Sequence, residues 1–173
     1  MKIAVFGATG FIGSYILDSL IKKGFEPSVL VREGSEDKLS QPEKCKIMTG
    51  DIKDKQAINE TINGTDCIIF NIGIIRQFPH QRITFDELHV QSAKRTIDTA
   101  LQLNVKRFIL MSANGVSPYG TEYQKTKYLA EKYLKKTNLD WTIFRPSLVF
   151  GPSRGKIEFC TQLRDDLIDL PLP

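Results

Sequence analysis

Three glycines near the amino terminus have the spacing of a turn that holds a diphosphate. Gly7, Gly10 and Gly13 form a GxxGxxG pattern between an apolar run and a helical pattern. The first glycine permits a tight turn, the second leaves room for the diphosphate, and the third lets the helix lie close to the sheet. Free N–H groups at the start of the helix would face the phosphates. The expected contacts with a dinucleotide include the other residues of this turn, Thr9, Phe11 and Ile12.

The end of the second apolar run bears on which dinucleotide would bind. Sites for NAD usually carry an acidic residue there, which binds the ribose 2′-hydroxyl. Arg32 occupies that place in the stretch VLVREGS. An arginine can pair with a 2′-phosphate in a bidentate manner and stack on adenine, so we expect NADP rather than NAD. Glu33 follows directly and keeps NAD open as the alternative.

Two tyrosine–lysine pairs have the YxxxK spacing. Tyr123 and Lys127 lie four residues apart, so they share one face of a predicted helix. Tyr128 and Lys132 match the same pattern. Tyr123 falls in the first turn of that helix, near the carboxyl ends of the strands where ligands bind, whereas Tyr128 lies deeper along it. We therefore expect Tyr123 and Lys127 to be the site residues.

Apolar runs alternate with helical patterns along the chain, which predicts parallel βαβ units. The predicted strands span 2–6, 28–31, 45–50, 66–73, 106–111 and 141–144, and the predicted helices span 11–23, 53–62, 84–103, 122–137 and 156–170. We expect a doubly wound parallel α/β sheet of the Rossmann type, in strand order 3-2-1-4-5-6, with helices on both faces. Trp141 is expected in the core and His89 in helix packing. The polar segment 74–87 is expected to be a surface loop, with a lid as the alternative.

The composition of the chain excludes several other classes of protein. It has 173 residues, a formal net charge of +4 and three cysteines far apart in sequence. No apolar run approaches the ~18 residues of a membrane span. The positive charge is spread along the chain, so we do not expect a nucleic-acid surface. Neither a disulfide framework nor a zinc site is expected, and the thiols suggest a reducing, cytoplasmic location.

These features resemble the extended and atypical short-chain dehydrogenases/reductases over almost the whole chain. The matching stretches are GATGFIGS (7–14), Gly50-Asp51, Asn71-Ile72-Gly73, the YxxxK at 123–127 and FRPSLVFGP (144–152). His89-Val90 and RFILMSA (107–113) resemble the atypical branch that contains the nucleotide-binding accessory subunit of respiratory complex I and its bacterial relatives. The resemblance implies contacts along a bound cofactor: Asp51 and Ile52 at adenine, Asn71, Ile72 and Gly73 at its middle, and Pro146 to Leu148 near the nicotinamide carboxamide.

The resemblance also implies a mechanism. The tyrosine, here Tyr123, would exchange a proton with the substrate oxygen, while Lys127 would bind the nicotinamide ribose and lower the tyrosine pKa. Ser112 is the hydroxyl at the end of the fifth strand that would hold a substrate carbonyl, although one alignment places Ala113 there. Two interpretations stay open. The chain is an oxidoreductase or epimerase/dehydratase acting on an unknown small molecule, or a non-catalytic subunit, assembly factor or redox sensor that holds NAD(P)H within a protein complex.

The last residues differ in character from the rest. We expect residues 1–150 to form the nucleotide-binding domain and residues 151–173 to begin a substrate-side segment that continues in a longer protein. A predicted helix at 156–170 would carry an apolar stripe that needs a surface to cover. The stripe consists of Ile157, Cys160, Leu163, Leu167 and Leu170.

Overall fold

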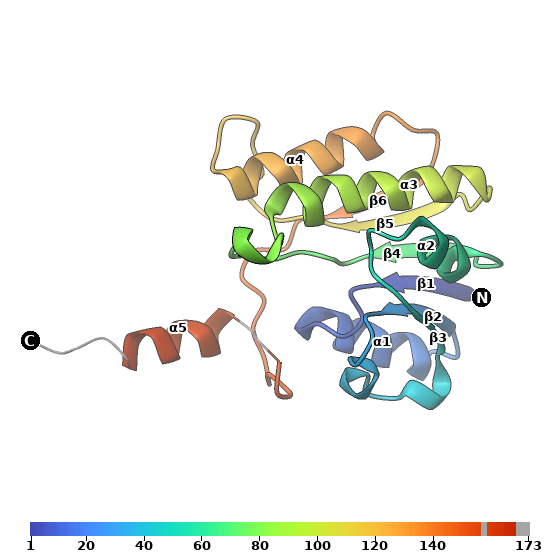
Figure 1. The fold of residues 1–173 in the computed structure, drawn as a ribbon, viewed down its shortest axis with the longest axis horizontal. Coiled ribbons are helices and arrows are strands. Elements are labelled where there is room, and N and C mark those ends of the chain that lie inside the picture. Colours follow the sequence, from blue (N-terminus) through green and yellow to red (C-terminus); the bar gives the residue numbers. More distant parts are fainter. Residues whose placement is uncertain (157–158, 169–173) are drawn as a thin grey trace, which may run out of the picture.

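A six-stranded parallel sheet organises the protein, as a computed structural model of residues 1–156 and 159–168 shows (Figure 1). The strand order is β3-β2-β1-β4-β5-β6, which confirms the predicted topology. The strands are β1 (Lys2–Phe6), β2 (Glu26–Val31), β3 (Lys46–Thr49), β4 (Cys67–Phe70), β5 (Arg107–Met111) and β6 (Asp140–Phe144). The α-helices are α1 (Phe11–Lys22), α2 (Lys55–Ile62), α3 (Ser92–Gln102), α4 (Glu122–Leu134) and α5 (Phe159–Ile168).

Two apolar cores form because alternate residues of each strand point to opposite faces of the sheet. Phe6 of β1, Phe70 of β4 and Phe108 of β5 belong to the larger core, which α2, α3 and α4 cover. Val5 and Val29 belong to the core under α1 on the other face. Figure 1 shows α2, α3 and α4 on one side of the sheet and α1 on the other. Because all six strands are parallel, their carboxyl ends lie along one edge of the sheet.

The prediction that Trp141 is a core residue is wrong. Its side chain in β6 is 38% exposed, and Phe144 at the end of the same strand is exposed as well. The reason is that β6 is the edge strand, so no further strand lies beside Trp141 on its outer side. Its register partner Phe108 belongs to the larger core, so Trp141 is exposed because it lies at the sheet edge and not because its face is uncovered. The apolar character of this strand therefore does not show that all of its side chains are buried.

The predicted helix 84–103 is also different in the structure. Its first part, Asp86–Gln91, is a π-helix (η4), and α3 begins directly after it at Ser92. The α4 helix starts with a capping box, in which the Thr121 side chain accepts from the Gln124 N–H and the Gln124 side chain accepts from the Thr121 N–H. This cap fixes the start of the helix one residue before Tyr123.

Three 3₁₀ turns complete the described elements, Glu36–Lys38 (η1), Pro42–Lys44 (η2) and Pro79–Gln81 (η3). The first two lie in the connection after β2 that the sequence predicts to be polar. In α5, Cys160 and Leu163 of the predicted stripe are exposed. The other stripe side chains, Ile157, Leu167 and Leu170, lie outside the described part. Among the described helices, none is both long enough and apolar enough to cross a bilayer.

Candidate functional site

The glycine turn between β1 and α1 has three different steric requirements. Gly7 has a φ of +88°, and a Cβ there would lie 2.8 Å from the Asn71 carbonyl oxygen. A Cβ on Gly13 would overlap the carbonyl group of Gly7, so the helix packs on the turn only without a side chain. At Gly10 the nearest protein atom would be 3.5 Å away, which is an ordinary contact. Gly10 is exposed, so the protein itself leaves the space beside it open.

The start of α1 can accept an anion. Gly10 is the N-cap residue of this helix, and no side chain caps it, whereas Asp54 caps α2 and Thr121 caps α4. The first N–H groups of a helix lack partners within the helix and carry its partial positive charge. In α1 these groups belong to Phe11, Ile12 and Gly13. The turn thus offers N–H donors and free space at the same point, which fits a diphosphate.

The residues expected at the adenine side follow β2 and β3. Arg32 and Glu33 come directly after β2 and are exposed. Asp51 is exposed and accepts from the Lys53 N–H at 2.8 Å, which fixes its carboxylate. Ile52 beside it is buried in the larger core.

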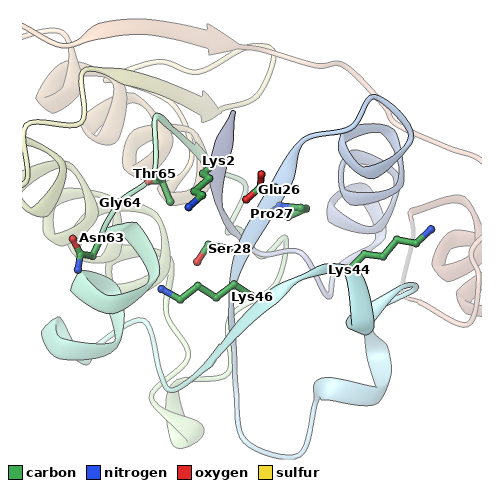
Figure 2. Close-up of a pocket in the computed structure, with 9 residues that line it drawn as sticks. All are labelled: Lys2, Glu26, Pro27, Ser28, Lys44, Lys46, Asn63, Gly64 and Thr65. Atoms are coloured by element: carbon green, nitrogen blue, oxygen red, sulfur yellow. The ribbon is translucent and has the colours of Figure 1, made fainter.

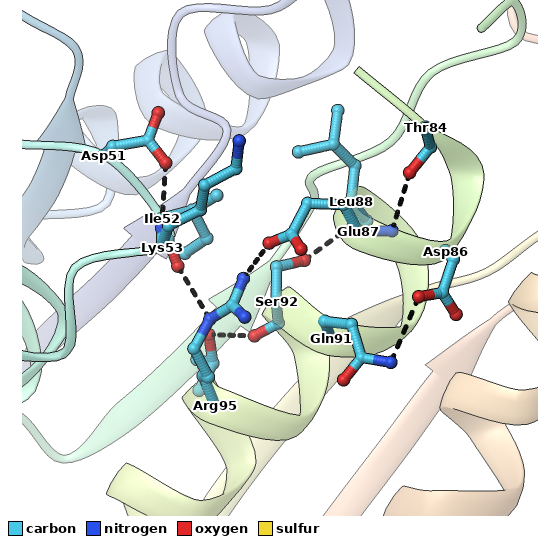
Figure 3. Close-up of polar contacts among 11 residues, drawn as sticks. Asp51, Ile52, Lys53, Thr84, Asp86, Glu87, Leu88, Gln91, Ser92 and Arg95 are labelled. Carbon is cyan, nitrogen blue, oxygen red and sulfur yellow. Dashed lines mark hydrogen bonds and ion pairs between the residues drawn. The ribbon is translucent and has the colours of Figure 1, made fainter. Parts of the chain in front are cut away.

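Arg95 of α3 connects this adenine side to the π-helix (Figure 3). Its Nε donates to the Ile52 carbonyl oxygen at 3.2 Å, and its Nη2 pairs with Glu87 of η4. The backbone after β3 and the helix that carries His89 are thereby held by one guanidinium group. Sequence reasoning missed this residue because no local pattern marks a contact between segments so far apart.

The residues expected at the middle of the cofactor follow β4. The Asn71 N–H donates to the Phe6 carbonyl oxygen at 2.9 Å, so the backbone stays beside the glycine turn past the end of the strand. Ile72 is partly buried against the larger core. Gly73 lies against Lys127, where a Cβ would come within 2.9 Å of Nζ. The structure therefore brings the glycine turn, this segment and Lys127 to one edge of the sheet.

Lys127 is a buried lysine at the carboxyl ends of β4 and β5. Its side chain is 6% exposed, and its Nζ donates to the Met111 carbonyl oxygen at 3.2 Å. Burial lowers the pKa of Lys127 from 10.5 to about 8. Lys132 of the alternative tyrosine–lysine pair is exposed. A buried ammonium with a depressed pKa is typical of functional sites.

Tyr123 lies one turn before Lys127 in α4 and is partly buried. Burial raises the pKa of its hydroxyl, although the resemblance implies a lowered value. The tyrosine ring packs edge-on against Phe85 and His89, with ring centres 5.6 and 5.3 Å apart. The Tyr123 side chain is therefore held by aromatic packing and keeps its proton in this structure.

His89 lies in this site, although the sequence predicts only a packing role for it. It is 1% exposed, and its Nε2 accepts from the Ile74 N–H at 3.2 Å. Its Nδ1 lies 2.9 Å from the Thr126 hydroxyl, which itself donates to the Glu122 carbonyl oxygen. These bonds define a neutral imidazole with its hydrogen on Nδ1. Burial and the charge of Lys127 lower the pKa of His89 to about 3. His89 thus joins the start of the 74–87 segment to α4.

The hydroxyl of Ser112 is hydrogen-bonded to a buried carboxylate, that of Glu131. This buried hydroxyl donates to Glu131 at 2.6 Å, and the same carboxylate accepts from Arg145 Nε at 2.8 Å. Glu131 is 1% exposed, and these hydrogen bonds and the charge of Arg145 lower its pKa despite its burial. Because its proton is engaged, Ser112 would have to leave Glu131 to donate to a substrate carbonyl.

The segment after β6 first contacts the residues that follow β5. The Asn114 N–H donates to the Pro146 carbonyl oxygen at 2.8 Å, and Leu148 is half exposed beyond it.

Further along, the segment packs on α1, where Tyr15 donates its hydroxyl proton to the Pro152 carbonyl oxygen at 2.8 Å. Lys156 then donates to the carbonyl oxygens of Thr9 at 3.0 Å and Lys38 at 2.8 Å. A lysine from the far end of the chain therefore lies between the glycine turn and the connection after β2. Sequence reasoning did not single out Lys156.

Comparison with known proteins places this arrangement among cofactor-binding proteins. Residues 7–166 match the family described as NAD(P)H-binding. The chain is 28% identical over 152 residues to the mitochondrial NADH-ubiquinone oxidoreductase 40 kDa subunit of Neurospora crassa, with 85% of this chain and 40% of that protein covered. It is 31% identical over 155 residues to the NADH dehydrogenase [ubiquinone] 1 alpha subcomplex subunit 9 of Dictyostelium discoideum, with 85% and 42% covered. The chain thus spans about two fifths of the length of these relatives.

Solved structures share the fold. A Bordetella bronchiseptica enzyme, WbmH, in complex with NAD+ superimposes with a TM-score of 0.79 at 21% identity, over 97% of this chain and 62% of that one. A putative NAD-dependent epimerase/dehydratase from Bacillus halodurans superimposes with a TM-score of 0.76 at 27% identity, over 88% of this chain and 72% of that one. The similarity therefore extends to nearly the whole of this chain.

Proposed function

This chain belongs to the NAD(P)H-binding family of atypical short-chain dehydrogenases/reductases, and we propose that its glycine turn holds the diphosphate of NADPH. The observation that carries the proposal is the open space at Gly10 beside the uncapped start of α1. Asp51 and Ile52 would contact adenine, and Asn71, Ile72 and Gly73 would line the middle of the cofactor. Thr9, Phe11, Ile12 and Gly13 would complete the diphosphate contacts, with Pro146 and Leu148 near the nicotinamide.

NADPH is favoured over NADH by the charges on the adenosine side. Arg32 is exposed directly after β2, where it can pair with a 2′-phosphate. A charge-assisted pair with Arg32 would strengthen NADPH binding by about tenfold or more. Fluorescence titration of the whole chain with both cofactors tests this. Equal affinities in the wild type, or an Arg32→Ala variant that keeps the preference, would contradict it.

The binding site itself is tested by Gly10→Val. A branched side chain there would occupy the space of the diphosphate and meet little of the protein, so binding is lost while the fold persists. Val29→Ala, in the core under α1, is a control for a general loss of stability. If Gly10→Val binds NADPH as well as the wild type, the diphosphate lies elsewhere.

For catalysis, we propose that Tyr123 exchanges a proton with the oxygen of a small carbonyl or hydroxyl substrate. When bound, the nicotinamide would supply or accept a hydride. Lys127 would bind the nicotinamide ribose from its position beside Gly73. Once that ribose is bound, the lysine charge would favour the deprotonated tyrosine. Ser112 would act as a positioning residue through Glu131, or as a direct donor if it is released.

A second candidate function is a non-catalytic subunit, assembly factor or redox sensor that holds the dinucleotide. It is supported by the Ser112–Glu131 bond, which engages the serine proton that would otherwise be donated to a substrate carbonyl, and by relatives named as subunits of NADH-ubiquinone oxidoreductase. We propose residues 1–150 as the nucleotide-binding domain and 151–173 as the start of a substrate-side segment in either case. Incubation of NADPH with a panel of carbonyl compounds separates an oxidoreductase from this second function, since an oxidoreductase consumes NADPH.

A further inference from the structure

A pocket lies at the amino ends of the strands, away from the glycine turn (Figure 2). It has a volume of about 290 Å³ and lies among the first residues of β1, β2 and β3 and the end of α2. Lys2 at one end of β1 lines the pocket, whereas Gly7 follows the other end of the same strand. Five residues of extended chain separate the two by roughly 16 Å. The pocket is therefore distinct from the proposed dinucleotide site.

Ser28 of β2 gives this pocket an unpaired hydroxyl. Its side chain lines the pocket and is 4% exposed. Among the side chains that the structure describes, its Oγ is the one buried oxygen or nitrogen without a hydrogen-bond partner. Buried polar groups are nearly always paired, so an exception calls for a partner from outside the chain.

The charged side chains of the pocket favour an anion as that partner. Its lining holds three lysines, Lys2, Lys44 and Lys46, against one acidic residue, Glu26. Figure 2 shows the ammonium groups of Lys2 and Lys46 on the same side as the Ser28 hydroxyl, whereas Lys44 extends away. Lys44 is already paired with Gln41 at 2.9 Å. Lys46 makes one long contact of 3.4 Å with the Glu60 carbonyl oxygen.

We propose that this pocket binds a phosphate group, either as inorganic phosphate or as the phosphate monoester of a small metabolite. A single water occupies about 30 Å³ of liquid, far less than the pocket provides. The volume lies at the lower end of small-molecule sites, which suits a small ligand and not a second dinucleotide. Two ammonium groups match the charge of about −2 on a phosphate at neutral pH, and the Ser28 hydroxyl would donate to one of its oxygens.

The test is a titration of the ¹⁵N-labelled chain, followed by NMR, with sodium phosphate and separately with glycerol 3-phosphate at constant ionic strength. We expect saturable shifts of the amides of Ser28, Gly64 and Thr65. Replacing Lys2 and Lys46 together by glutamine should weaken binding by about tenfold or more, because charge-assisted bonds are lost. The matched control Lys44→Gln removes the same charge from the same pocket and should change affinity less than about twofold, since its ammonium points away.

Three results would overturn the proposal. The first is that neither phosphate compound gives a saturable shift. The second is that the double lysine variant binds as tightly as the wild type, and the third is that Lys44→Gln weakens binding as much as the double variant. Tighter binding of one compound identifies free phosphate or a monoester as the natural ligand. NADPH added to the same samples reports on residues 7–13, so the dinucleotide proposal succeeds or fails independently.

Discussion

Lowering the pH from 7 to 5 is expected to destabilise the fold through one side chain, the buried imidazole of His89. In the unfolded chain this group has its ordinary pKa of 6.5, whereas in the folded protein burial and the charge of Lys127 lower its pKa to about 3. Between these values the unfolded chain binds a proton that the folded chain does not. The buried imidazole therefore costs no stability above pH 6.5, and the free energy of unfolding decreases as the pH falls below that value.

The size of the effect follows from the two pKa values. Between pH 7 and pH 5 the free energy of unfolding should fall by about 2 kcal/mol. Other shifted groups add little in this window. Lys127, with a pKa of about 8, is charged in both states below pH 7. Glu131 has its pKa lowered from 4.5, so its contribution is lost mainly at lower pH.

Urea unfolding at pH 7 and pH 5, followed by circular dichroism, measures the effect. His89→Asn should remove most of the difference in the free energy of unfolding between pH 7 and pH 5, even if the variant is less stable than the wild type at pH 7. The chain has two histidines, and His80 lies exposed in η3, so His80→Asn is a matched control that should behave as the wild type. If the wild type is equally stable at both pH values, or if His89→Asn keeps the full difference, the assignment of a buried neutral imidazole is wrong.

Three further changes test other parts of the site. Gly13→Ala should lower the Tm by about 6–12 °C, because a methyl group against backbone costs about 3 kcal/mol, whereas Gly10→Ala should cost at most about 1 kcal/mol in differential scanning fluorimetry. Arg145→Ala removes one partner of the buried Glu131 and should cost about 1–2 kcal/mol in urea unfolding, because the arginine is half exposed and Lys135 and Ser112 stay bonded to the carboxylate; a loss below about 0.5 kcal/mol would contradict that pairing. Tyr123→Phe should reduce any measured kcat by about 10²–10⁴-fold while the Kd for NADPH stays within about twofold. An unchanged kcat would exclude this tyrosine as the proton donor.

The fold and the glycine turn are the parts that sequence reasoning predicts well. Strands such as 2–6 are short apolar runs because parallel strands are covered on both faces, and that signal is local. The turn is equally local, since the requirements at Gly7 and Gly13 come from neighbouring backbone. Trp141 shows the limit, because the same kind of apolar run also occurs in an edge strand, which has a neighbouring strand on one side only.

The chemistry of the site is less predictable because it depends on contacts between distant segments. The buried state of His89 arises from Ile74 and Thr126, which lie in two other segments. The hydroxyl of Ser112 is engaged by Glu131, and no spacing rule relates the two residues. Sequence reasoning identifies Tyr123 and Lys127, but the protonation state of each side chain depends on the packing around it.

The π-helix η4 has a consequence for how many residues this segment can contain. In a regular α-helix, His89 would be rotated from Ile97 by about 80°, since eight residues turn about 800°. A π-turn takes up one extra residue, so the eight residues turn only about 700° and His89 lies within about 20° of Ile97; His89 at 1% exposure and Ile97 at 0% both face inward. Deletion of Gln91 would remove the extra residue and leave seven residues of regular helix between His89 and Ile97, which again turn about 700°, so the imidazole would stay beside Tyr123. A related chain one residue shorter at this point would therefore keep both the Rossmann core and the histidine in its site, with a regular α-helix in place of the π-turn.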